Sequence, residues 1–325
     1  MPGLGGQLTL RVLITGVSRG LGPDLARRLE RHDDVRAVFG LDVVPPRLRF
    51  RRLQFFRADL RQPSASELIK ELDPDVVVHL ATQVAATAAI PRQAHETNVM
   101  GTMNVLAGSQ RARRLVVKSS TAVYSSGLEL PSLLTEEDGR RGAPAGAAGR
   151  DLREVELTVR EFAMVNDTVD VVVLRLGQVL GRRWPSPLAE YLALEAPPTV
   201  PGFDPRLQLL SEDAALEAVE RAALGSHAGV FNVAGQGVLL LSQLLRLAGR
   251  RGRPILPPMG GTWVRRQAYR AATGHDLPDH LIQLLSDGQA IDCRRLEEAS
   301  GWRPRESTAD VAVKFAAPPV FQKAG

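Results

Sequence analysis

A glycine-rich loop near the start of the chain has the residue types and spacing of a phosphate-binding turn. The segment Arg11-Val12-Leu13-Ile14 is typical of a buried strand, and a helix is expected to begin near Leu21. Glycines in the intervening turn allow a tight bend, close approach of the backbone to a pyrophosphate, and close helix–strand packing. The helix N-terminus then offers free N–H groups and the positive end of its dipole. We therefore expect dinucleotide binding by the loop residues Gly16, Ser18, Arg19, Gly20, Leu21 and Gly22.

Two aspartates that follow the next strands suit the adenosine end of such a cofactor. Asp42 ends a strand expected at 37–42, where a carboxylate accepts hydrogen bonds from ribose hydroxyls and repels a 2′-phosphate. Arg19 acts in the opposite sense, because a guanidinium can pair with a 2′-phosphate. Asp59 follows a strand expected at 52–58, and it either binds the adenine amino group or forms a turn. The sequence thus favours NAD and leaves NADP open.

The acid–base pair that often accompanies such a loop is a Tyr with a Lys four residues later, and it has no counterpart in this chain. The three tyrosines are Tyr124, Tyr191 and Tyr269, and four residues after them stand Leu128, Glu195 and Thr273. General acid–base catalysis contributes roughly 10²–10⁴ in rate, and here it lacks its usual groups. We expect a cofactor site whose chemistry departs from the common pattern.

Strand and helix patterns alternate through the first half of the chain, which predicts a parallel sheet with helices on both faces. Further strands are expected at 76–80, 115–119 and 169–174, and helices at 64–72, 92–107 and 151–165. The Gly/Ala-rich run 142–149 is interpreted as a mobile loop. The predicted fold class is α/β, a Rossmann-type doubly wound parallel sheet with a smaller C-terminal α/β substrate lobe. We assign 9–181 to the dinucleotide-binding domain, with 203–235 returning to it, and 182–202 and 236–320 to the lobe.

Composition narrows the classes of function. No run of about 18 apolar residues is present, so no membrane span is expected, and the first residues do not resemble a signal peptide. The net charge of +5 is scattered over many arginines rather than gathered in a stripe, so nucleic acid is not an expected partner. The single cysteine, Cys293, favours a reducing cytoplasm. The six histidines show no paired spacing, so no metal site is predicted.

Beyond the loop, several motifs stand in a fixed order along the chain. They are Val78-His79-Leu80-Ala81, Asn98-Val99-Met100-Gly101-Thr102, Ser119-Ser120-Thr121-Ala122-Val123-Tyr124, and the segments 174–181, 206–213, 231–235 and 301–304. Together they resemble the extended short-chain dehydrogenase/reductases, the NAD-dependent epimerase/dehydratases. Within that family the chain is most similar to an actinobacterial subgroup labelled UDP-glucose 4-epimerase-like. The resemblance implies NAD as the cofactor and adds Leu60, Leu80, Ala81 and Asn98 to its site.

The resemblance also indicates the substrate side of the site. Ser120 stands four residues before Tyr124, where the family carries its catalytic Ser or Thr, so it either contacts a substrate oxygen or caps the strand end. Thr121 stands where the family's dehydratases carry the first residue of an Asp-Glu pair, so dehydration is not expected. Arg206 either binds a substrate diphosphate or lies on the surface. The implied substrate contacts are Ser120, Thr121, Gln178 and Arg206.

Alignment through Glu156 puts Ala148 and Leu152 at the family's Tyr and Lys positions, and neither side chain can exchange a proton. The nearby candidates for a replacement acid or base are His95, Arg150, Asp151 and Glu154. Two functions stay open: an atypical NAD(P)-dependent enzyme acting on a nucleotide-sugar-like or other polar small molecule, and a non-catalytic NAD(P)-binding sensor or heterodimer partner. The resemblance implies a dimer built from the helices at 92–107 and 151–165. A homodimer is the first expectation and a heterodimer the second.

Overall fold

The computed structural model describes residues 9–83, 91–125, 131–144, 146–255, 262–274 and 276–317. The centre of the protein is a 7-stranded sheet in the order β11-β6-β5-β4-β1-β2-β3, with every neighbouring pair parallel. Its strands are β1 (Leu10–Thr15), β2 (Val35–Asp42), β3 (Leu53–Arg57), β4 (Val76–His79), β5 (Arg114–Ser120), β6 (Asp170–Leu176) and β11 (Gly229–Val233). The predicted α/β class with a Rossmann-type sheet is confirmed.

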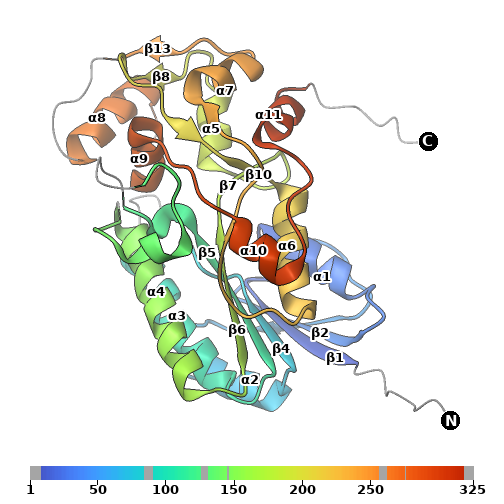
Figure 1. Ribbon diagram of the computed structural model, residues 1–325. Helices are drawn as coiled ribbons and strands as arrows, with labels where there is room; N and C mark the ends of the chain where they lie inside the picture. Colours follow the sequence, from blue (N-terminus) through green and yellow to red (C-terminus); the bar gives the residue numbers. More distant parts are fainter. Residues whose placement is uncertain are drawn as a thin grey trace.

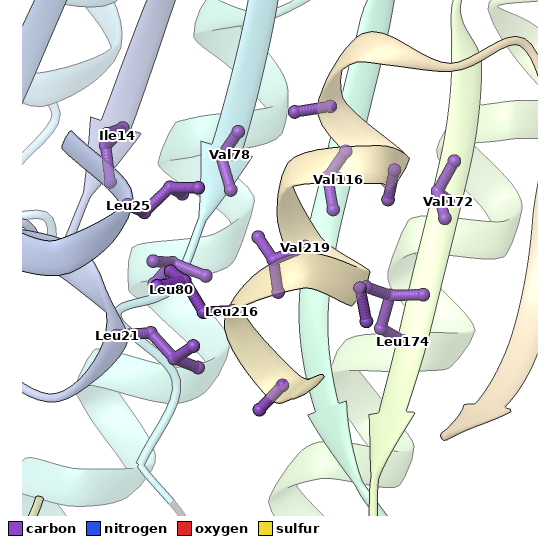
Figure 2. Packing of buried hydrophobic residues seen from close by; sticks show 14 of the residues in the cluster. Ile14, Leu21, Leu25, Val78, Leu80, Val116, Val172, Leu174, Leu216 and Val219 are labelled. Atoms are coloured by element: carbon purple, nitrogen blue, oxygen red, sulfur yellow. The ribbon is translucent and has the colours of Figure 1, made fainter. Parts of the chain in front are cut away.

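Helices cover both faces of this sheet (Figure 1). One layer holds α2 (Ser64–Leu72), α3 (Pro91–Gly108) and α4 (Gly146–Val165), and the other holds α1 (Leu21–Leu29) and α6 (Glu212–Leu224). Side chains alternate along a strand, so Leu13 packs into the first layer and Ile14 into the second. Figure 2 shows the second layer, where Leu25 of α1 and Val219 of α6 lie over the central strands. Apolar cover on both faces is what a parallel sheet requires.

A smaller group of elements lies beyond the carboxyl ends of the central strands (Figure 1). It contains α5 (Pro187–Ala193), α7 (Leu241–Leu247), α8 (Thr262–Thr273), α9 (Asp279–Asp287) and α11 (Thr308–Ala316), with β8 (Pro198–Thr199), β9 (Arg206–Leu207), β12 (Leu239–Leu240) and β13 (Arg253–Pro254). The pair β7 (Gln178–Leu180) and β10 (Leu209–Ser211) leads into it, and α10 (Arg294–Ser300) returns to the main sheet. Tyr191 and Tyr269 are buried in its apolar core, so neither is a catalytic tyrosine. The division into a domain at 9–181 with 203–235 and a lobe of the remaining parts stays a prediction.

One element departs from expectation. α4 begins at Gly146, not at residue 151, so the described residues 146–149 of the Gly/Ala-rich run form a helical turn. Alanine is the best helix former, which offsets the cost of the glycines. Gly149 has a packing reason, because a Cβ there would lie 2.5 Å from the carbonyl oxygen of Ala122. Residue 145 lies outside the described residues. Within the described parts, no helix has the length and apolar character to cross a bilayer.

Candidate functional site

The glycine loop between β1 and α1 has the backbone geometry of a phosphate cradle. Gly16 and Gly20 have φ values of +74° and +54°, a region that favours glycine. A Cβ on Gly16 would lie 2.9 Å from the backbone of Ala81, and one on Gly22 would lie 2.3 Å from the carbonyl oxygen of Gly16. Gly20 has no atom within 4 Å of its Cβ position, so its side is open to a ligand. The N-terminus of α1 begins directly after it, and the arrangement fits a pyrophosphate.

Asp42, at the end of β2, holds this loop through its carboxylate. Its Oδ2 accepts a hydrogen bond from the N–H of Ser18 at 3.0 Å, and its Oδ1 accepts one from the N–H of Val43 at 2.8 Å. Each carboxylate oxygen has more than one acceptor position, so both can still accept from ribose hydroxyls. Arg19, which follows Ser18 in the chain, is exposed. The fit to an NAD adenosine is good, and the presence of Arg19 leaves the predicted choice between NAD and NADP to experiment.

The segment after β4 is fixed next to the loop by buried polar contacts. The amide of Asn98 in α3 accepts from the N–H of Gln83 at 2.7 Å and donates to its carbonyl at 3.1 Å. His79 bridges Thr15 and Thr102 at 2.6 and 2.9 Å, and burial lowers the pKa of His79 to about 3. These contacts bring Leu80 and Ala81 against Gly16. Four residues of the predicted cofactor site therefore lie together at the carboxyl ends of β1 and β4.

Asp59 and Leu60 lie after β3, the edge strand beside β2. Both carboxylate oxygens of Asp59 accept from the guanidinium of Arg61 at 2.6–3.1 Å, and Oδ1 also accepts the N–H of Arg61. The Arg61 guanidinium holds the pKa of Asp59 below its ordinary value. Leu60 is buried, and its carbonyl accepts from Asn104 of α3 at 2.8 Å. The turn described for Asp59 is present, and adenine contact by this residue stays a prediction.

The end of β5 meets the smaller lobe in a narrow cavity. Ser120 Oγ accepts from the N–H of Ala122 at 3.2 Å and caps the short helix η1 (Thr121–Val123). The Thr121 hydroxyl is buried without a hydrogen-bond partner in the described structure. The Gln289 side chain donates to the carbonyl of Thr121 at 3.2 Å, and the backbone N–H of Gln289 donates to the carbonyl of Arg206 at 2.8 Å. The cavity is lined by Thr121, Ala122, Tyr124, Gln178, His280, Gln283, Leu284, Gly288 and Gln289.

The first turns of α4 carry no proton-exchanging group at the two positions taken from the family. Leu152 is fully buried in an apolar cluster with Ala122, Val123, Tyr124 and Leu134. Ala148 is half-buried one turn earlier. The helix lies close to η1 through Gly149 and close to α9 through Gly146, where a Cβ would lie 2.6 Å from Cβ of Asp279. The N-terminal end of α4 thus lies against both η1 and α9.

The hydroxyl of Tyr124 belongs to a buried polar network. Its hydroxyl donates to Asn232 at 2.6 Å and accepts from Arg175 at 3.0 Å, and burial raises its pKa to about 12. Arg175 binds Glu156 of α4 at 2.6 Å, and Ser119 donates to the same carboxylate at 2.5 Å. The network fixes β5, β6 and α4 relative to one another. It therefore positions the strand end that carries Ser120.

Of the four replacement acid–base candidates, two form a pair. His95 Nδ1 of α3 lies 2.9 Å from Asp151 Oδ1 of α4, and this contact raises the pKa of His95 above its ordinary value. Arg150 and Glu154 are exposed and have no ion pair within the described parts of the chain. No group of three or more metal-ligating side chains occurs among the residues that the structure describes.

The raised pKa of His95 predicts a pH-dependent contribution to stability. A group whose pKa is higher in the folded state stabilises the fold below its unfolded value, about 6.5, and loses that effect as pH rises through the folded value. The difference in Tm between wild type and His95→Gln should therefore be largest near pH 6 and shrink toward pH 9. Thermal unfolding across this range measures it, with His32→Gln as the control. A constant difference would contradict an ion pair.

Two titratable side chains that the sequence does not single out lie at this edge of the sheet. Lys118 is near the end of β5, and its ammonium donates to the carbonyl of Thr82 at 2.7 Å. His280 of α9 lines the cavity beside Thr121 and Gln178. Neither has a local motif: Lys118 occupies a strand position otherwise suited to an apolar residue, and His280 reaches the site only through the packing of the lobe.

Comparison with known proteins agrees with this geometry. The model of the NAD dependent epimerase/dehydratase family matches residues 12–192. An uncharacterised protein of Mycobacterium tuberculosis strain H37Rv is 35% identical over 311 residues, which cover 92% of this chain and 81% of that protein.

Solved structures share the fold over nearly the whole chain. UDP-glucose 4-epimerase of Thermotoga maritima, with UDP-glucose, has a TM-score of 0.72 at 19% identity and covers 94% of this chain and 97% of its own. WbmG of Bordetella bronchiseptica, in complex with NAD and UDP, has a TM-score of 0.71 at 19% identity. The match covers 97% of this chain and 94% of WbmG. The dTDP-glucose 4,6-dehydratase of Bacillus anthracis, in complex with NAD, has a TM-score of 0.70 at 16% identity. The match covers 95% of this chain and 96% of the dehydratase.

Proposed function

Because this chain belongs to the NAD dependent epimerase/dehydratase family, we propose that it binds NAD and acts as an atypical oxidoreductase on a nucleotide-sugar-like or other polar small molecule. The observation that carries the proposal is the intact cofactor cradle of Gly16, Asp42 and Asn98 at the same sheet edge as Ser120 and Gln178. The cradle holds a dinucleotide pyrophosphate at α1 and a ribose at Asp42.

Each part of the site has a separate task in this proposal. NAD, when bound, supplies a hydride acceptor or donor. Ser120 and Gln178 contact substrate oxygens, and Arg206 binds an anionic part of the substrate. The lobe residues Gln283 and Gln289 exclude water from the end of β5. The side chains of Ala148 and Leu152 cannot donate or accept a proton. We propose that His280 does so, because it is the one imidazole lining the described cavity.

A second function stays in view, because an intact cradle beside a degenerate proton-transfer position also suits a non-catalytic NAD(P) sensor or heterodimer partner. The missing groups at Ala148 and Leu152 support it. Turnover by the purified protein alone would exclude this alternative.

The cofactor proposal predicts a measurable preference. NAD should bind tighter than NADP by roughly 10–100-fold, because the Asp42 carboxylate repels a 2′-phosphate. Asp42→Asn should bring the two affinities close together, since the amide keeps the shape without the charge. Isothermal titration calorimetry on the free protein measures both. Asp34→Asn, a change at an exposed residue just before β2, is the matched control.

The outcomes separate clearly. If neither dinucleotide binds, the proposed function is wrong. If NADP binds tighter than NAD in the wild type, Arg19 and not Asp42 sets the preference, and Arg19→Ala should reverse it.

We also propose a homodimer through the outer faces of α3 and α4. Met100 and Met103 are 49% and 54% exposed on α3, and Leu157 and Met164 are 56% and 77% exposed on α4. Exposed apolar side chains gathered on adjacent helices favour a protein partner. Sedimentation should give twice the chain mass, and Met103→Glu should return it to the mass of one chain.

A further inference from the structure

Lys118 is a partly buried ammonium without a counter-charge. Among the described lysines, Lys70 and Lys314 each pair with a glutamate, at 2.9 and 3.0 Å. Lys118 has no ion pair within the described structure, and its one hydrogen bond goes to the neutral carbonyl of Thr82 at 2.7 Å. The Thr82 hydroxyl donates back to the carbonyl of Lys118 at 2.7 Å. This reciprocal contact fixes the ammonium and leaves two of its three N–H donors available.

The position of this ammonium relates it to the cofactor cradle. Lys118 precedes Ser120 by two residues on β5, so the two side chains leave the same face of the strand. Thr82 directly follows Ala81, whose backbone lies against Gly16 of the loop. A continuous set of contacts therefore joins Lys118, the segment after β4 and the phosphate loop.

A buried charge is costly unless it is paired. From the geometry we infer that Lys118 is a cofactor-anion residue, whose ammonium pairs with the dinucleotide pyrophosphate. This inference rests on the proposed binding of NAD, and it assigns a role that neither the glycine loop nor the helix dipole fills, since both offer only partial charges.

Burial lowers the pKa of Lys118 to about 8, which gives the inference a second readout. Around this ammonium, β4 contributes His79, whose pKa of about 3 keeps it neutral at higher pH. On β6, Arg175 pairs beside Ser119, on the opposite face of the sheet. An anion that binds the protonated ammonium raises its pKa. Affinity for the anion should then fall about tenfold between pH 7 and pH 9 as the free protein loses the proton.

The test uses ADP-ribose, which carries the pyrophosphate but no nicotinamide, with ADP and adenosine as further probes. Lys118→Gln removes the charge and can still donate to Thr82, and Lys70→Gln on α2 is the matched control. We expect Lys118→Gln to bind ADP-ribose and ADP roughly 10–100-fold more weakly by calorimetry, with adenosine unchanged. The pH dependence between 7 and 9 should disappear in this variant, and Lys118→Arg should recover part of the affinity.

Three results would overturn the inference. The first is affinity for ADP-ribose within twofold of wild type in Lys118→Gln. The second is a loss confined to ADP-ribose and absent with ADP, which would move the contact to the distal ribose. The third is a Tm of the free variant well below wild type with unchanged ADP-ribose affinity, which would make Lys118 structural. Absence of ADP-ribose and NAD binding in the wild type would instead count against the proposed function.

Discussion

Glu156→Gln should lower the free energy of unfolding by about 3–5 kcal/mol, because it leaves a buried guanidinium without its counter-charge. Arg175 and Glu156 make contacts of 2.6–3.1 Å, and their side chains are only 6% and 10% exposed. Solvent screening is therefore weak at this pair. Guanidinium chloride unfolding followed by circular dichroism measures the loss.

The same helix supplies a matched control. Glu154 is exposed and has no ion pair within the described parts of the chain, so Glu154→Gln should change the free energy of unfolding by less than about 0.5 kcal/mol. A loss of less than about 1 kcal/mol for Glu156→Gln would show that Arg175 finds another partner or water. In that case the network would not be what fixes α4 on β6.

This network also explains what sequence reasoning can and cannot reach at Tyr124. The motif at 119–124 identifies the strand end, because strand, serines and tyrosine are adjacent in the chain. The role of the tyrosine depends on Asn232 and Arg175, which lie 108 and 51 residues away. No local pattern predicts that three such groups meet and satisfy one another in the interior.

The cofactor cradle was predictable for the opposite reason. Local backbone geometry and close packing require glycine at positions 16, 20 and 22, so the loop can be recognised from a few consecutive residues. Asp42 could be found because the end of β2 lies beside the end of β1 in any parallel sheet of this kind. The start of α4 was misjudged, since a Gly/Ala-rich run has weak periodicity and its helical form depends on contact with η1 and α9.

The lobe side of the site was the least predictable part. His280 belongs to none of the motifs that identify the site, and α9 is remote in sequence from β5. Only the packing of α9 against the N-terminal end of α4 brings the His280 imidazole to the cavity with Thr121 and Gln178. A histidine on such an element cannot be assigned to the site from sequence, because its position depends on how the smaller lobe packs on the main sheet.

If His280 exchanges the proton, His280→Asn should lower kcat by roughly 10²–10⁴ while NAD affinity stays within twofold of wild type. The assay follows conversion of nucleoside-diphosphate hexoses by chromatography, with His32→Asn as the control for loss of a histidine elsewhere.

The pH profile distinguishes this histidine from a tyrosine–lysine pair. Burial lowers the pKa of His280 to about 4, so the ring is neutral and able to accept a proton above that value. The kcat/KM of the wild type should be flat from about pH 5 to pH 8 and fall as pH drops through about 4. If the wild type converts substrate and His280→Asn keeps full activity, the proton moves through another group, and His95 with Asp151 becomes the next pair to substitute. If the wild type binds NAD but converts none of these sugars, the non-catalytic alternative gains the stronger support.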